Sequence, residues 1–259
     1  MFDVPYCCAF YGHSHAARLF TAYDALVTEN GEENIKPIFK FGLLRGLEKM
    51  LDDDDDSPDL HTEVRSLIEN MNSEPEPEVI VTILKGSATN VFSQPRHPRP
   101  FDFILPDMAD AGIMAGAEVI PYTLLKRRLA HEMQKGSEEF RHLLTSLAPG
   151  KPVYFVPPPP PVSSEEFLCR QTGRLPRQLN AVGVNPRIFR RKFWLAGLDL
   201  LRDVAATHGA EVIDLPPEVF DEEGLLAERF WEDATHGNQD YSLLLLKTID
   251  CFIRSKLAR

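Results

Sequence analysis

Ser14 stands between two histidines, in the sequence Gly-His-Ser-His that follows an apolar run near the start of the chain. A serine hydroxyl is a weak nucleophile at its ordinary acidity, so it needs a base that a third group holds in place. Asp233 and His236 could supply both, because a separation of three residues within one turn brings a carboxylate to one imidazole nitrogen and leaves the other nitrogen free. The sequence therefore predicts a nucleophile, Ser14, a base, His236, and an orienting carboxylate, Asp233.

Each of these features also has a simpler structural explanation. Ser14 could merely cap the helix that we expect to begin near Ala16, since serine is favoured at helix N-termini. An Asp-x-x-His sequence is also common in ordinary capping. A serine at a helix N-terminus is nevertheless well placed to react, because backbone N–H groups and the helix dipole stabilise a developing oxyanion there.

The elements that must bring these residues together form a regular pattern along the chain. Short apolar runs alternate with longer segments of helical period, which is typical of a parallel sheet covered on both faces. The expected strands are 6–11, 35–41, 79–84, 153–156 and 211–215. The expected helices are 16–27, 43–51, 60–71, 124–147 and 186–208, with a closing helix marked by the stripe Tyr241, Leu244, Leu245, Thr248 and Phe252. We therefore predict an α/β fold, a three-layer α/β/α, doubly wound, mainly parallel five-stranded sheet with Ser14 at its carboxyl edge.

Two segments interrupt this pattern within what we expect to be a single domain, 1–259. A proline-rich insertion near 91–122 includes residues 93–107, which are too irregular for a strand or a helix and predict a long connection. The acidic run 51–59 indicates a solvated loop.

The proline run Pro157–Pro161 ends the fourth expected strand, because proline cannot continue a ladder of backbone hydrogen bonds. It predicts a stiff exit from the sheet or a rigid wall of a cleft. Together with Phe101 and Phe103 of the insertion, this run is our candidate lining for a substrate pocket.

The acidic balance of the chain limits its partners. A net charge of −11 over 259 residues and a pI near 5.2 disfavour nucleic acid and anionic membranes, which attract basic surfaces, and favour a small-molecule or carbohydrate substrate. The sequence has no apolar run of the roughly 18 residues that a membrane span needs, and its start lacks the features of a signal peptide. We therefore expect a cytoplasmic protein. The cysteines lack the spacing of a metal or redox motif and predict buried thiols, at Cys7, Cys8, Cys169 and Cys251.

Four short sequences spread over nearly the whole chain resemble those of the SGNH hydrolases, also called GDSL-type esterases. They are YGHSH, FKFGLLRG, VIVTILKGSATN and DATHGN, in the order and the secondary-structure context of the family's blocks. The resemblance implies a flavodoxin-like SGNH hydrolase fold and a serine-dependent ester hydrolase that forms an acyl-enzyme, with Ser14, His236 and Asp233 as its triad. It also implies an oxyanion hole made by the N–H groups of Ser14 and Gly42 and the side-chain amide of Asn90, and it implies no metal or organic cofactor.

The chain departs from the family's pattern at two points. His13 replaces the aspartate that usually precedes the nucleophile, and Asn90 lies four residues after Gly86, where the common spacing is two. Other candidates for the oxyanion positions are Gly46, Ser87 and Thr89.

Three other functions stay open at this point. An acyltransferase would use the same acyl-enzyme and pass the acyl group to an alcohol. A metal-dependent hydrolase could use His13, His15 and His236, together with Asp233. A non-catalytic ligand-binding module would keep the fold while Ser14 and the Asp-His pair served structural roles.

Overall fold

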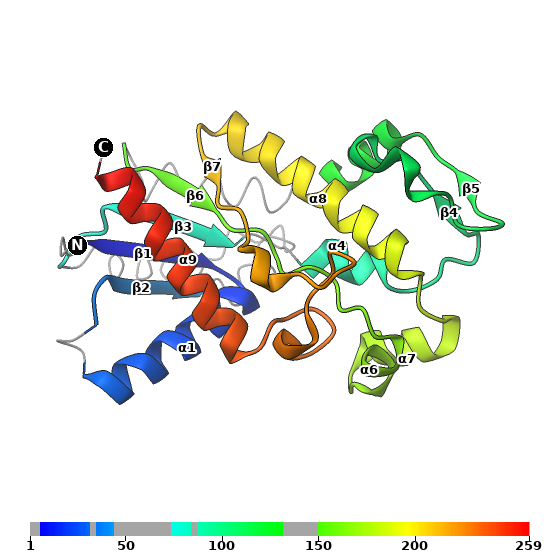
Figure 1. Ribbon diagram of the computed structural model, residues 1–259. Helices are drawn as coiled ribbons and strands as arrows, with labels where there is room; N and C mark the ends of the chain where they lie inside the picture. The colour runs from blue at the N-terminus through cyan, green and yellow to red at the C-terminus, as the bar shows by residue number, and fades with distance from the viewer. Residues whose placement is uncertain (1–5, 32–34, 44–73, 84–86, 132–149, 259) are drawn as a thin grey trace, which may run out of the picture.

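The central element of the fold is a five-stranded parallel sheet (Figure 1). The computed structural model describes residues 6–31, 35–43, 74–83, 87–131 and 150–258. The strands of the sheet, in spatial order, are β2 (Ile38–Leu43), β1 (Cys7–Gly12), β3 (Val79–Ile83), β6 (Val153–Phe155) and β7 (Glu211–Val212). Counted along the chain this order is 2-1-3-4-5, which is the doubly wound arrangement of flavodoxin-like sheets. The predicted fold class is therefore confirmed.

The interior strand β1, which lies between β2 and β3, shows why this sequence forms a covered parallel sheet. All six of its residues are buried, as expected for an apolar run that has helices on both sides. Its register is fixed by both neighbours, since Tyr11 lies beside Gly42 of β2 and Thr82 of β3.

The helices that cover the sheet come from three parts of the chain. Near the N-terminus lies α1 (Ser14–Asn30), and near the C-terminus lies α9 (Gln239–Leu257). The long helix α8 (Arg187–Thr207) precedes the last strand. These correspond to three of the expected helices. The expected helices 43–51 and 60–71 and the acidic run 51–59 lie outside the described residues, and the expected helix 124–147 is described as helical over 122–131 only.

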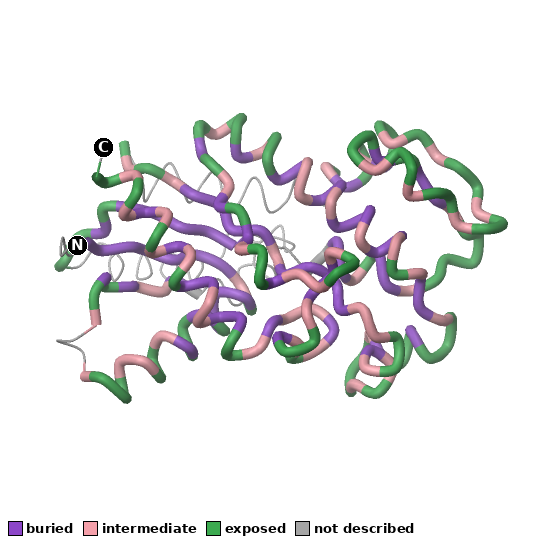
Figure 2. The backbone as a smooth tube through the Cα atoms, in the orientation of Figure 1, coloured by how far each residue is buried: buried purple, intermediate pink, exposed green. Residues whose placement is uncertain are grey.

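Two adjacent residues of β6 show that α8 and α9 lie on opposite faces of the sheet. The ring of Tyr154 contacts Phe252 of α9, with centroids 5.0 Å apart. The ring of Phe155 packs with Leu201 and Ala205 of α8. Since successive side chains of a strand point to opposite faces, the sheet has a helix layer on each side. In Figure 2 the interior strands β1 and β3 are buried while the outer faces of these helices are exposed.

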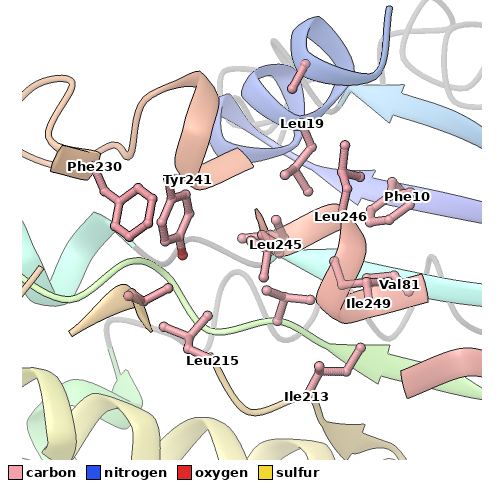
Figure 3. Packing of buried hydrophobic residues seen from close by; sticks show 14 of the residues in the cluster. Phe10, Leu19, Val81, Ile213, Leu215, Phe230, Tyr241, Leu245, Leu246 and Ile249 are labelled. Atoms are coloured by element: carbon pink, nitrogen blue, oxygen red, sulfur yellow. The ribbon is translucent and has the colours of Figure 1, made fainter. Parts of the chain in front are cut away.

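The main core lies between the sheet and the helices α1 and α9 (Figure 3). Phe10 of β1 and Leu19 of α1 meet Leu245 and Ile249 of α9 in this cluster. The same layer includes Tyr241, in the first turn of α9, whose ring lies beside Phe230. The start of α9 is thereby fixed against the carboxyl edge of the sheet.

The proline-rich insertion has more regular structure than the sequence predicts. Residues 93–107, expected to be irregular, contain a short strand and the start of a 3-10 helix. The elements here are α4 (Ser87–Ser93), β4 (Phe101–Asp102), η2 (Pro106–Ala111) and β5 (Glu118–Val119). β4 and β5 form a separate two-stranded parallel sheet, because the N–H of Glu118 and that of Ile120 bond to the carbonyls of Pro100 and Asp102.

A buried ion pair attaches this small sheet to α8. Lys192 Nζ lies 2.6 Å from Asp102 Oδ1, and the two side chains are almost completely buried. The expectation of one domain over 1–259 stays a prediction. Two further helices that the sequence analysis missed are α6 (Glu165–Arg170) and α7 (Arg174–Val182). Among the helices described, none is both long and apolar enough to span a membrane.

Candidate active site

Ser14 lies at the point where β1 passes into α1. β1 ends at Gly12 and α1 begins at Ser14, so only His13 separates the strand from the helix. This close passage requires glycine, because a Cβ at Gly12 would lie 2.7 Å from the carbonyl oxygen of Ile83 in β3. Ser14 is exposed, at the positive end of a helix of 17 residues.

The structure brings together the three residues that the sequence predicts as a nucleophile, a base and an orienting carboxylate. Ser14 Oγ lies 2.7 Å from His236 Nε2. On the other side of the ring, His236 Nδ1 lies 2.8 Å from Asp233 Oδ2 and 3.0 Å from Oδ1. With the Nδ1 proton directed at Asp233, Nε2 is left to accept the hydroxyl proton of Ser14.

The turn that carries Asp233 and His236 keeps the carboxylate ionised. Asp233 Oδ1 accepts hydrogen bonds from the N–H groups of Thr235 and His236, at 2.8 and 2.9 Å. Burial raises the pKa of Asp233, but the hydrogen bonds from His236 and Thr235 outweigh it, and the net pKa lies well below the ordinary value. The imidazole therefore faces a permanent negative charge, which favours one tautomer and stabilises an imidazolium.

His15 lies behind the imidazole of His236. The two rings have centroids 4.7 Å apart, and His15 is buried. Burial, followed by the nearby His236, lowers the pKa of His15 to about 3, so His15 is neutral in any ordinary buffer. Over the described part of the chain, no three metal-ligating side chains come together. His236 directs its two ring nitrogens at Ser14 and Asp233, so the described residues do not group His13, His15 and His236 as ligands for a metal ion.

The residue after the base is a glycine for a steric reason. A Cβ at Gly237 would collide with the ring of Tyr241, one turn into α9. Asn238 then caps α9, since its side chain accepts a hydrogen bond from the N–H of Tyr241. The turn that carries Asp233 and His236 and the start of α9 are thus one tightly packed unit.

The structure does not settle the roles of the expected oxyanion residues. Gly42 lies inside β2, beside Tyr11, and is buried. Asn90 lies on α4 and is fully buried, and its side-chain amide donates to the carbonyl of Pro159 at 3.0 Å. Thr89 is buried beside Gly197 of α8. Gly46 and the side chain of Ser87 lie outside the described residues. The oxyanion roles of Gly42 and Asn90 therefore stay predictions.

The candidate pocket lining stays a prediction for the prolines and is wrong for Phe103. Pro157 and Pro159 line a small cavity of about 10 Å³ together with His15 and Gly237. Phe103 instead has no exposed surface and packs among the aromatic rings Phe189, Phe193 and Tyr122 in the core beneath the insertion. The apolar character of the insertion thus reflects its own core rather than a substrate surface.

Sequence reasoning missed two residues that contact the turn formed by residues 232–236. Arg18 pairs with Glu232 at 3.1 Å. It lies one helical turn after Ser14, and this i, i+4 spacing could have indicated that Arg18 lies on the same helix face as Ser14. Gln94 donates from its side chain to the carbonyl of Ala234 at 2.7 Å. No local pattern predicts this contact, because the two residues are 140 positions apart.

Comparisons with known proteins find likeness only in structure. No protein-family model matches the chain, and no curated protein matches it. Three of the similar solved structures are an extracellular lipase from Streptomyces rimosus, a GDSL-like lipase from Bacteroides thetaiotaomicron and the periplasmic domain of a lipopolysaccharide acetyltransferase from Salmonella ser. Paratyphi A.

These similarities cover most of each chain but are distant. The lipase from Streptomyces rimosus is 13% identical with a TM-score of 0.47, over 94% of this chain and 99% of that chain. The GDSL-like lipase is 10% identical with a TM-score of 0.44, over 96% and 88%. The acetyltransferase domain is 14% identical with a TM-score of 0.49, over 97% and 85%. The fold class rests on the strand order and register of this chain, and its chemistry has to be inferred from the site.

Proposed function

We propose that this chain is a serine-dependent ester hydrolase of the SGNH type, acting on a small acyl group carried by an alcohol or a carbohydrate. One observation carries the proposal: Ser14 Oγ, the imidazole of His236 and the carboxylate of Asp233 form a continuous hydrogen-bonded chain. A structural cap needs no base beside it, whereas a nucleophile needs this arrangement.

The first half of the reaction transfers the acyl group to the enzyme. Ser14 Oγ attacks the ester carbonyl carbon while its proton passes to His236 Nε2, and the resulting imidazolium is stabilised by Asp233. The tetrahedral intermediate collapses by breaking the bond to the alcohol oxygen, which takes the proton from Nε2. The products of this half are the free alcohol and an acyl ester on Ser14.

The second half releases the acyl group. His236 Nε2 takes a proton from a water molecule, whose oxygen attacks the acyl carbon, and the bond to Ser14 Oγ then breaks with return of the proton. The negative charge on the carbonyl oxygen would be bound by the N–H of Ser14 at the start of α1, with Gly42 and Asn90 as the further proposed donors. An acyltransferase would run the same steps with a second alcohol in place of water.

The direct test is covalent labelling of the nucleophile. Purified protein is treated with a fluorophosphonate, with and without a chelator, and the adduct is read by intact mass beside Ser14→Ala and the control Ser255→Ala at the far end of α9. We expect one adduct on the wild type and on Ser255→Ala, none on Ser14→Ala, and no effect of the chelator. An unlabelled wild type, or chelator-sensitive ester hydrolysis, contradicts the proposal and favours the metal-dependent alternative.

Turnover separates hydrolysis from transfer. A series of p-nitrophenyl esters of increasing acyl length tests the proposed preference for small acyl groups, and addition of a sugar or alcohol acceptor tests for transfer. A hydrolase releases acid at a rate that the acceptor does not change. Faster consumption of the donor with acyl-acceptor product would identify a transferase instead.

A further inference from the structure

We propose that Gln94 is a positioning residue for the catalytic base: its side chain fixes the turn that carries Asp233 and His236 against the body of the protein. This inference rests on the function proposed above, because it assigns a role at the same site. Among the described residues, the hydrogen bonds of Ser14 and of the His236 imidazole do not include Gln94.

The contact joins two segments that are remote in sequence. Gln94 Nε2 donates to the backbone carbonyl of Ala234 at 2.7 Å, and Gln94 has no exposed surface. Ala234 is also buried, and it lies between the carboxylate and the base in the chain. A movement of Gln94 therefore moves the peptide on which both catalytic side chains depend.

The turn needs an anchor outside itself. Its internal hydrogen bonds, from Thr235 and His236 to Asp233, fix the acid relative to the base. They do not fix the base relative to Ser14, which arrives from the other end of the chain. The ion pair of Arg18 with Glu232 also crosses to the turn, but both side chains are well exposed and contribute little rigidity.

Gln94 is held rigidly by a buried polar network. The N–H of Asn185 donates to the carbonyl of Gln94 at 2.7 Å, and the side-chain amide of Asn185 donates to the carbonyls of Ser93 and Pro95 at 2.9 and 2.8 Å. The buried guanidinium of Arg190 donates in turn to the carbonyl of Asn185 at 3.0 Å. This network ties the end of α4 to the start of α8, so the anchor belongs to the rigid frame of the fold.

Stability alone does not account for a glutamine at this position. Gln94 Oε1 is buried and accepts no hydrogen bond from the described residues. An unpaired buried oxygen destabilises the fold, and that loss offsets much of what the single bond to Ala234 contributes. Fixing the catalytic turn is a benefit of Gln94 that the free energy of unfolding does not measure.

The test compares Gln94→Met, which keeps the length of the side chain but has no donor, with Gln94→Leu, which is shorter and also has no donor for Ala234. Ser93→Ala is the matched control, because it changes the neighbouring buried residue, whose hydroxyl bonds only to the carbonyl of Asn90. We expect kcat on a p-nitrophenyl ester to fall by about 10- to 100-fold in both Gln94 variants. KM should stay within about twofold of the wild type, since Gln94 makes no contact at the reacting serine.

Two further readouts separate positioning from folding and from the proposed function. We expect the melting temperature of Gln94→Met to match that of the wild type or exceed it, while the NMR signal of the His236 Nδ1 proton broadens or shifts. Unchanged kcat, an unchanged His236 signal, or failure of both Gln94 variants to fold beside a folded Ser93→Ala would each overturn the role of Gln94. If the wild type is not labelled at Ser14 but the His236 signal still responds to Gln94→Met, the proposed function fails and the positioning role stands.

Discussion

Ser14 Oγ and His236 Nε2 lie 2.7 Å apart although 222 positions separate the two residues in the chain. The first strand brings Ser14 to the carboxyl edge of the sheet, and the turn before the last helix brings His236 to the same edge. Because α1 and α9 pack side by side on one face, the starts of the two helices bring Ser14 and the turn of His236 together (Figure 1). The candidate site is therefore a direct product of the winding order of the sheet.

Asp233→Asn should lower kcat for ester hydrolysis by about 10³- to 10⁴-fold, because the amide no longer stabilises the imidazolium or selects its tautomer. Glu232→Gln is the control, since Glu232 is the adjacent acid and its side chain pairs with exposed Arg18 rather than with His236. Steady-state kinetics on an activated ester measures both. Similar losses of kcat in the two variants would indicate that the total negative charge of the turn determines the rate, rather than the orientation of His236 by Asp233.

His15 should make the folded protein less stable at acid pH. Its pKa of about 3 in the folded state lies below the ordinary value of about 6.5 that applies in the unfolded chain. Between these values the unfolded state binds the extra proton, so stability is lost as the pH falls from about 6.5 towards 3, at up to about 1.4 kcal/mol per pH unit. His15→Gln should reduce this slope in urea unfolding measured at several pH values. An identical slope in the variant would show that the ring of His15 is protonated in the folded state.

Gly12→Ala should destabilise the fold by about 1–3 kcal/mol, because the added Cβ would press on a backbone oxygen of β3 that cannot move aside. Urea unfolding measures the loss, and fluorophosphonate labelling measures the accompanying shift of Ser14. Gly209→Ala in the turn after α8 is a useful comparison, since its Cβ would meet nothing and only its positive φ opposes the change. A Gly12 variant as stable as the wild type would contradict the close passage of β1 and β3.

Asp102→Asn should destabilise the protein by about 3–5 kcal/mol, because it leaves the ammonium of Lys192 buried without its negative partner. Glu223→Gln breaks the exposed pair with Arg187 and should change stability by about 1 kcal/mol or less. Differential calorimetry of the two variants checks both values. Equal effects would mean that Lys192 reaches water when its partner is lost.

The grouping of Ser14, His236 and Asp233 and the five strands could be predicted because each carries a local signal. The strand residues form short apolar runs, and Asp233 lies within one turn of His236. Gln94 and Asn185 carry no such signal, because their roles depend on backbone carbonyls that only the folded chain brings near them. The short helices α6 and α7 were missed for a related reason: with 6 and 9 residues they offer too few positions for an apolar period.

The insertion shows how tertiary contacts override composition. Its prolines and charges predict an irregular connection, yet Asp102 becomes a strand residue because its carboxylate bonds to the N–H groups of Phe103 and Met114 and to buried Lys192. Phe103 looked available for a substrate in the sequence because nothing there indicated the aromatic cluster on α8 that covers it.

The proline run beside the site is a wall made only of acceptors. Proline has no N–H, so the backbone of the run can only accept hydrogen bonds. Trp194 Nε1 donates to the carbonyl of Pro158, and Asn90 Nδ2 donates to that of Pro159. The N–H of Leu226 donates to the carbonyl of Pro161. The backbone of such a run is already restricted in the unfolded chain, so ordering it loses less conformational entropy than ordering a typical loop. The proline side of the small cavity beside His15 is thus stiff by its covalent structure, and three donors from separate parts of the chain only have to hold it in place.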